Sequence, residues 1–128
     1  MFHYTAYWFI HIWGDPMAKP AHRTYSRQSL EALELLAKMI RVGRIDRKMS
    51  AQEMANRAAI SRPLLRRIES GDPGCAIGSV FEVAAIAGVP LFGGEPDRIQ
   101  TQRSALTEKL SLLPQRVRKP RRVIHDDF

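Results

Sequence analysis

Two helix-start signals separated by a very short connection constrain this chain more than any other feature. Residues 50–53 (SAQE) form a capping box, in which a serine hydroxyl and a glutamate carboxylate satisfy free amides at a helix start. Ser61 is a second N-cap, followed by Pro63 in the first helical turn, where the missing proline amide costs nothing. Only residues 59–60 separate the two predicted helices. We therefore expect two short helices, at 50–58 and 61–70, joined by a tight turn.

The residues around this pair predict further helices. Apolar side chains recur at helical spacing from Ser29 to about Arg47, and the segment IGSVFEVAAIAG before Val89 predicts a fourth helix after the turn at Gly71. A fifth helix is expected over residues 97–113. The side chains predicted to face the core are Leu33, Leu36, Ala37, Ile40, Met54, Ala55, Ala58, Ile60, Leu65, Ile68, Val80, Val83, Ala84 and Ala87. The sequence predicts an all-α, compact domain of four to five helices.

Composition divides the chain into four parts. We expect a flexible N-terminal extension at 1–28, a helical domain at 29–94, a C-terminal helix at 95–113 and a basic disordered tail at 114–128. The first sixteen residues hold six of the ten aromatic side chains and neither Lys nor Arg, and they lack the pattern of a secretory signal. They are interpreted as an upstream extension of the reading frame or a flexible arm, or alternatively as an apolar arm that pairs across a dimer.

Charge and residue usage narrow the class of protein. The 20 Lys and Arg against 13 Asp and Glu leave a net charge of +7, which favours a polyanionic partner. The single cysteine, Cys75, is typical of a reducing cytoplasm and is expected to be a small buried or half-buried filler. The four histidines lack nearby ligands at metal-binding spacing, and the serines lack a base. We therefore expect neither an enzyme nor a site for a metal or other cofactor.

The predicted pair of short helices has the geometry that places one helix in the major groove of DNA while the other crosses the backbone. The segment SAQEMANRAAISRPLLRRIESGDPG resembles the lambda-repressor-like, Xre-type helix-turn-helix family. Within it, SRPLLRRIESGDPG, together with the later LLPQRVRKPRR and the terminal DDF, resembles HipB-type antitoxins of bacterial toxin-antitoxin operons.

The resemblance implies a recognition helix over residues 61–70. Its base-reading positions fall on Ser61, Arg62, Pro63 and Arg67, with Leu64 and Arg66 beside them. Arg62 and Arg67 are the candidates for guanine contacts, because a guanidinium can satisfy both major-groove acceptors of that base, and Arg66 is expected on a phosphate.

Two positions depart from the pattern of the family. Ala51 stands where the family often has a phosphate-binding glutamine, and the neighbouring Gln52 is the candidate replacement. Ala59 stands where the family usually has a turn glycine, so the turn avoids a positive φ or tolerates about 1 kcal/mol of strain.

The family also pairs an arginine late in its first helix with the glutamate that ends the recognition helix. The matching residues here are Arg44 and Glu69, so Glu69 is expected to be structural.

The function expected from these features is a homodimeric repressor with two recognition helices roughly 34 Å apart, or a multiple of that, on double-stranded DNA. The HipB resemblance implies repression of its own operon and restraint of a HipA-like kinase toxin, in the cytoplasm at the bacterial nucleoid. Two alternatives stay open: a module that binds only a partner toxin, and a stand-alone phage-type repressor. The tail, with its terminal Asp126, Asp127 and Phe128, is expected to track phosphates, to anchor on a partner, or only to solubilise the chain.

Overall fold

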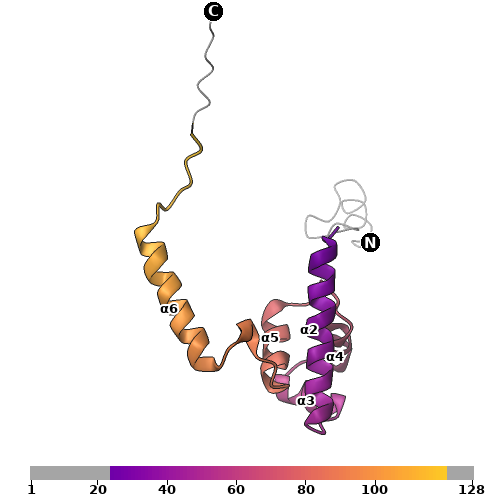
Figure 1. Ribbon diagram of the computed structural model, residues 1–128. Helices are drawn as coiled ribbons and strands as arrows, with labels where there is room; N and C mark the ends of the chain where they lie inside the picture. The colour runs from indigo at the N-terminus through magenta and orange to yellow at the C-terminus, as the bar shows by residue number, and fades with distance from the viewer. Residues whose placement is uncertain (1–23, 121–128) are drawn as a thin grey trace, which may run out of the picture.

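The computed structural model describes residues 24–120. It contains helices α2 (Arg27–Asp46), α3 (Ala51–Ala58), α4 (Arg62–Glu69) and α5 (Ile77–Ile86), a short 3₁₀ turn η1 (Leu91–Gly93), and helix α6 (Pro96–Leu112). Helices α2 to α5 pack into one bundle, and α6 stands away from it on the side of α5 (Figure 1). The prediction of an all-α fold of four to five helices is confirmed for the described residues.

Some of the predictions lie outside the described residues. They are those for the first 23 residues and those for residues 121–128, with the terminal Asp126, Asp127 and Phe128.

The core is formed where α2, α3, α4 and α5 meet. Its fully buried side chains of largest volume are Ile40, Met54, Leu65 and Val83, one from each of the four helices. Most of the side chains predicted to face inward are buried, while Leu33, Leu36, Ala58, Ile60 and Val80 are half-buried at the edge of the core. Helical periodicity therefore located the buried face of each helix correctly.

Serine side chains begin three of the helices. The hydroxyl of Ser50 accepts a hydrogen bond from the Glu53 amide at 3.1 Å, and that of Ser61 accepts one from the Leu64 amide at 3.2 Å. Helix α2 begins two residues earlier than its periodicity predicted, at Arg27, because Ser26 accepts a hydrogen bond from the Ser29 amide. These caps fix the start of each helix by satisfying amides that have no helical partner.

The turn between α3 and α4 contains a strained residue. Ala59 ends α3 in the left-handed conformation, with φ of 54° and ψ of 43°. The amide of the next residue, Ile60, donates to the carbonyl of Ala55 at 3.0 Å, which closes the turn tightly. Of the two outcomes predicted for this turn, the structure shows the strained one. A residue with a Cβ adopts the left-handed conformation only at a steric cost.

Replacing Ala59 with glycine is expected to raise the free energy of unfolding by about 1 kcal/mol, because glycine adopts this backbone conformation without steric cost. Urea unfolding followed by circular dichroism measures the change. Ala32, exposed within α2, is the matched control: there glycine is expected to destabilise the fold by about 0.5–1 kcal/mol. Equal destabilisation at both positions would show that the turn is not strained.

Helices α2 and α5 cross at a glycine. A Cβ built on Gly43 would collide with the backbone carbonyl of Ala87, just after α5, and would lie 3.2 Å from the Cβ of Ala87. Because the obstacle is backbone, it cannot be relieved by a change of rotamer. Gly43→Ala is therefore expected to lower the free energy of unfolding by about 2 kcal/mol through overpacking. A urea midpoint that does not move would contradict this close approach.

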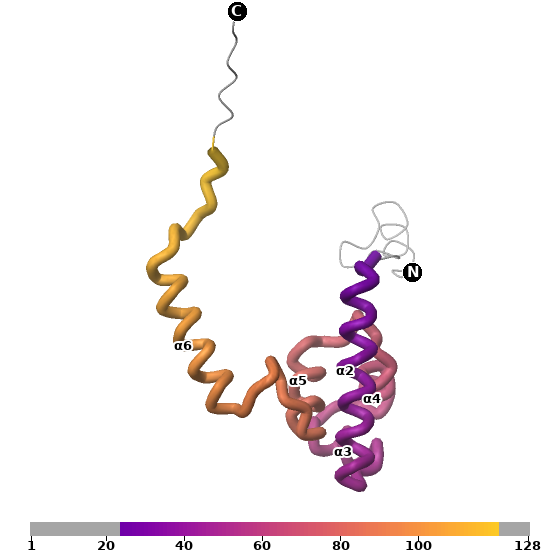
Figure 2. The backbone as a smooth tube through the Cα atoms, viewed as in Figure 1, coloured from indigo at the N-terminus to yellow at the C-terminus, as the bar shows by residue number. Residues whose placement is uncertain are grey.

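Helix α6 contributes nothing to the core. None of its residues is buried, and only Ile99, near its start, is half-buried. The backbone of α6 runs away from the bundle (Figure 2). Within residues 24–120, no helix combines the length and apolar character needed to cross a membrane.

Candidate nucleic-acid interface

Helix α4 separates its side chains cleanly into a buried face and an exposed face. Leu65 and Ile68 are buried, whereas Arg62, Arg66 and Arg67 are exposed. Ser61 and Pro63, at the start of the helix, are exposed as well. The helix is thus anchored by its apolar side and turns its basic side outward.

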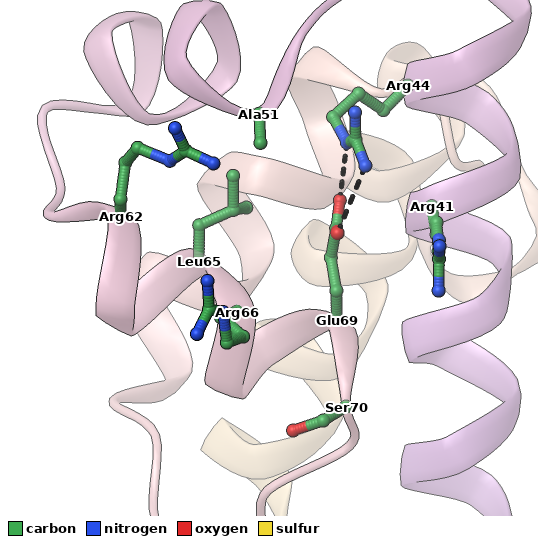
Figure 3. Close-up of a pocket in the computed structure, with 8 residues that line it drawn as sticks. All are labelled: Arg41, Arg44, Ala51, Arg62, Leu65, Arg66, Glu69 and Ser70. Atoms are coloured by element: carbon green, nitrogen blue, oxygen red, sulfur yellow. Dashed lines mark hydrogen bonds and ion pairs between the residues drawn. The ribbon is translucent and has the colours of Figure 1, made fainter.

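The basic side of α4 forms one wall of an open groove of about 340 Å³. Arg62 and Arg66 lie on that wall, Arg41 lies on α2 across the groove, and Ala51 marks the start of α3 (Figure 3). The residues that line the groove are Arg41, Arg44, Ala51, Arg62, Leu65, Arg66, Glu69 and Ser70, so four arginines share it with a single carboxylate.

That carboxylate is held by Arg44. Its oxygens accept hydrogen bonds from Nε of Arg44 at 2.6 Å and from a terminal nitrogen at 3.2 Å, a bidentate pair (Figure 3). The other terminal nitrogen donates to the carbonyl of Met49 at 3.0 Å. Both side chains of the pair are only 13% exposed. Arg44 therefore ties α2 to α4 and to the loop before α3, and it neutralises Glu69.

The other three arginines of the groove remain basic. Among the described residues, Arg41, Arg62 and Arg66 form no ion pair and donate no side-chain hydrogen bond. Three exposed guanidinium groups with open donors converge on one concave surface, which suits a polyanion.

Arg67, one of the predicted guanine readers, differs from Arg41, Arg62 and Arg66 in having an ion-pair partner. Its Nε donates to Oδ2 of Asp72 at 2.7 Å, and the other oxygen of Asp72 accepts from the amide of Gly74 at 2.7 Å. Asp72 also raises the pKa of the Arg67 guanidinium through this hydrogen bond and its charge. Arg67 therefore braces the turn after α4, and its guanidinium is partly engaged.

Three further predicted site residues also make contacts within the protein. Leu64 is half-buried and packs against the core, and its place beside the base-reading residues stays a prediction. Gln52 is exposed on α3, and its amide nitrogen donates to the side-chain oxygen of Asn56 at 2.8 Å. The side-chain oxygen of Ser61 is occupied as an acceptor by its capping bond, which leaves its hydroxyl hydrogen for a partner.

The sequence reasoning missed Arg41. It precedes Arg44 by three residues, so the two lie on neighbouring turns of one face of α2, and this spacing was a usable signal.

Two other kinds of site, a reactive thiol and a metal site, are not supported in the part of the chain that the structure describes. Burial raises the pKa of the half-buried Cys75 thiol, which favours its protonated form. Residues 24–120 contain no cluster of three or more His, Cys, Asp or Glu side chains that could hold a metal ion.

Comparison of the chain with protein-family models, with curated proteins and with solved structures finds no match. The interface is therefore characterised by its geometry alone.

Proposed function

We propose that the protein binds double-stranded DNA in a sequence-specific way and regulates transcription, with α4 lying in the major groove. The observation that carries the proposal is the exposed basic side of α4, next to the start of α3 and across a groove from Arg41. A short helix anchored by its apolar side and bearing outward arginines has the size and charge that the major groove accepts.

The side chains divide into base contacts and phosphate contacts. Arg62, in the first turn of α4, is the proposed guanine reader, with Ser61 and Pro63 beside it. Arg66 and Arg41, farther along the groove, are proposed to bind phosphates, and the starts of α3 and α4 add backbone amides of favourable polarity. Arg67 is the second proposed guanine reader: its Nε binds Asp72, and its terminal nitrogens keep donors for a base.

The proposed biological role rests on the resemblance of residues 50–74 to Xre-type regulators. In this proposal the protein is a homodimeric antitoxin of the HipB type in the bacterial cytoplasm. It represses its own promoter and restrains a HipA-like kinase. Support for the antitoxin role comes from the sequence similarity alone, and a kinase gene next to this one would strengthen it.

A salt titration of DNA binding tests the proposal against a purely protein-binding module. Binding of the full chain to labelled DNA from the region upstream of its own gene is measured by fluorescence anisotropy between 50 and 200 mM salt. With about six phosphate contacts per dimer, the affinity is expected to fall roughly 10³-fold over this range. A chain that ignores duplex DNA at the lowest salt would overturn the proposal and favour the alternative, which acts only on a partner toxin.

A further inference from the structure

Two uncovered apolar stripes lie on different helices of this chain. The α6 stripe consists of Ile99, Leu106 and Leu110, which recur at helical spacing, and the last two are 59% and 68% exposed. The α2 stripe consists of Leu35, Met39 and Val42, which are 61%, 38% and 57% exposed. A helix of the length of α6 is marginal in water by itself, so its stability requires something that covers its apolar side.

The charges beside the stripes differ in a way that selects a partner. By helical spacing Arg103 lies within the α6 stripe and Arg98 and Lys109 flank it, while the acids of α6, Asp97 and Glu108, project from the opposite side. Two α6 helices packed against each other would therefore bring basic groups together, and like charges across an interface are costly.

The α2 stripe carries the complementary charge. Glu31 lies one turn before Leu35, and Asp46 follows Val42 at the next helical step. Two basic side chains lie on that side, and both are in exposed ion pairs: Arg27 binds Glu31 at 2.8 Å and Lys38 binds Glu34 at 2.7 Å. Asp46, which forms no ion pair among the described residues, leaves this stripe with a net negative charge that suits the basic edge of α6.

In the structure, helix α6 does not reach the α2 stripe of its own chain. Helix α6 extends away from the bundle beside α5, and α5 lies between it and α2 (Figures 1 and 2). A second copy offers its α2 without this obstacle. In a two-fold arrangement, each α6 would cover the α2 stripe of the other chain, and no stripe would stay exposed.

We infer that the protein dimerises by exchange of α6, whose apolar stripe packs on the α2 stripe of a second copy. The inference rests on the proposed function only for the expectation of a dimer, and it names the surface. Since its tests use no DNA, a DNA-binding monomer would overturn this inference alone, and a dimer that ignores DNA would overturn the proposed function alone.

Self-association of the full chain is measured by sedimentation equilibrium. Leu106→Glu is expected to weaken it about 30-fold or more, because a buried hot spot would then hold a charge. Leu112 is the matched control: it is 82% exposed, lies off the stripe, and tolerates the same change within the same helix. Equal weakening by both variants, or a monomeric wild type, would overturn the inference.

Cross-linking identifies which helices meet. In a Cys75→Ser background, one chain carries Val42→Cys and another carries Leu106→Cys, and the two are mixed. A disulfide-linked dimer that forms in the mixture, and in neither chain alone, is expected. Linkage of the Leu106→Cys chain to itself would show paired α6 helices. An intramolecular link in a monomeric double variant would show that α6 folds onto its own α2. Either result would overturn the inference.

The aromatic N-terminal segment of the same chain is the other candidate to cover the α2 stripe. Both tryptophans, Trp8 and Trp13, belong to the aromatic N-terminal sequence, so tryptophan emission reports on that segment alone. Emission that is unchanged by Leu35→Glu is expected. A red shift on this substitution, together with self-association that Leu106→Glu leaves intact, would assign the stripe to the N-terminal segment and overturn the exchange of α6.

Discussion

Replacing Glu69 with alanine is expected to lower the free energy of unfolding by about 3 kcal/mol or more, the largest loss of stability predicted for a single substitution in this chain. The substitution removes both carboxylate hydrogen bonds from Arg44, whose side chain is only 13% exposed, and leaves its charge with the carbonyl of Met49 as the single partner. Urea unfolding followed by circular dichroism measures the loss, and the melting temperature should fall with it.

The control for this experiment is an ion pair of the same type on the surface. Glu34 binds Lys38 on α2, where both side chains are more than half exposed, so Glu34→Ala is expected to leave the free energy of unfolding nearly unchanged. The double variant Arg44→Met, Glu69→Leu should recover most of the lost stability, because no unpaired charge is then buried. An unchanged melting temperature for Glu69→Ala would show that the pair does not hold α2 to α4.

The elements that local sequence signals control were predictable. Ser50 and Ser61 cap their helices through amides three residues away, so the start of α3 and α4 depends on residues within one turn. The buried faces followed equally well from helical spacing. Only the start of α2 was displaced, because Ser26 and Ser29 are both capable N-caps and the periodicity alone did not choose between them.

The finer details of the site depend on contacts that spacing does not specify. Arg67 faces outward on α4 as periodicity requires, yet the turn after the helix folds back and brings Asp72 to its Nε. Leu64, which the resemblance places beside the base-reading positions, also packs against the core. Arg41 enters the groove only because α2 passes α4 at this level. Each outcome follows from how helices pack, which a pattern along one helix does not contain.

Replacing Arg62 with alanine is expected to weaken binding to the specific DNA site by about 1–3 kcal/mol, roughly 5- to 150-fold, with little change on random DNA. Arg62 is exposed in the first turn of α4, and among the described residues its guanidinium has no ion-pair partner, so its donors are available to the two acceptors of a guanine. The site is first selected from a random DNA library, and anisotropy then measures affinity for the selected and scrambled duplexes.

Two other arginines provide the comparison that makes this result specific to base reading. Arg66→Ala is expected to weaken both duplexes alike, because a phosphate contact carries no sequence information. Arg27→Ala removes the same charge from the far end of α2, where Arg27 binds Glu31, and should change neither affinity appreciably. Unfolding of the Arg62→Ala variant should match the wild type, since Ser61 still caps α4 and no core side chain is altered. Equal losses on the selected and scrambled duplexes for Arg62→Ala would move this side chain from the bases to the backbone, and Ser61 and Pro63 would then have to account for any remaining preference.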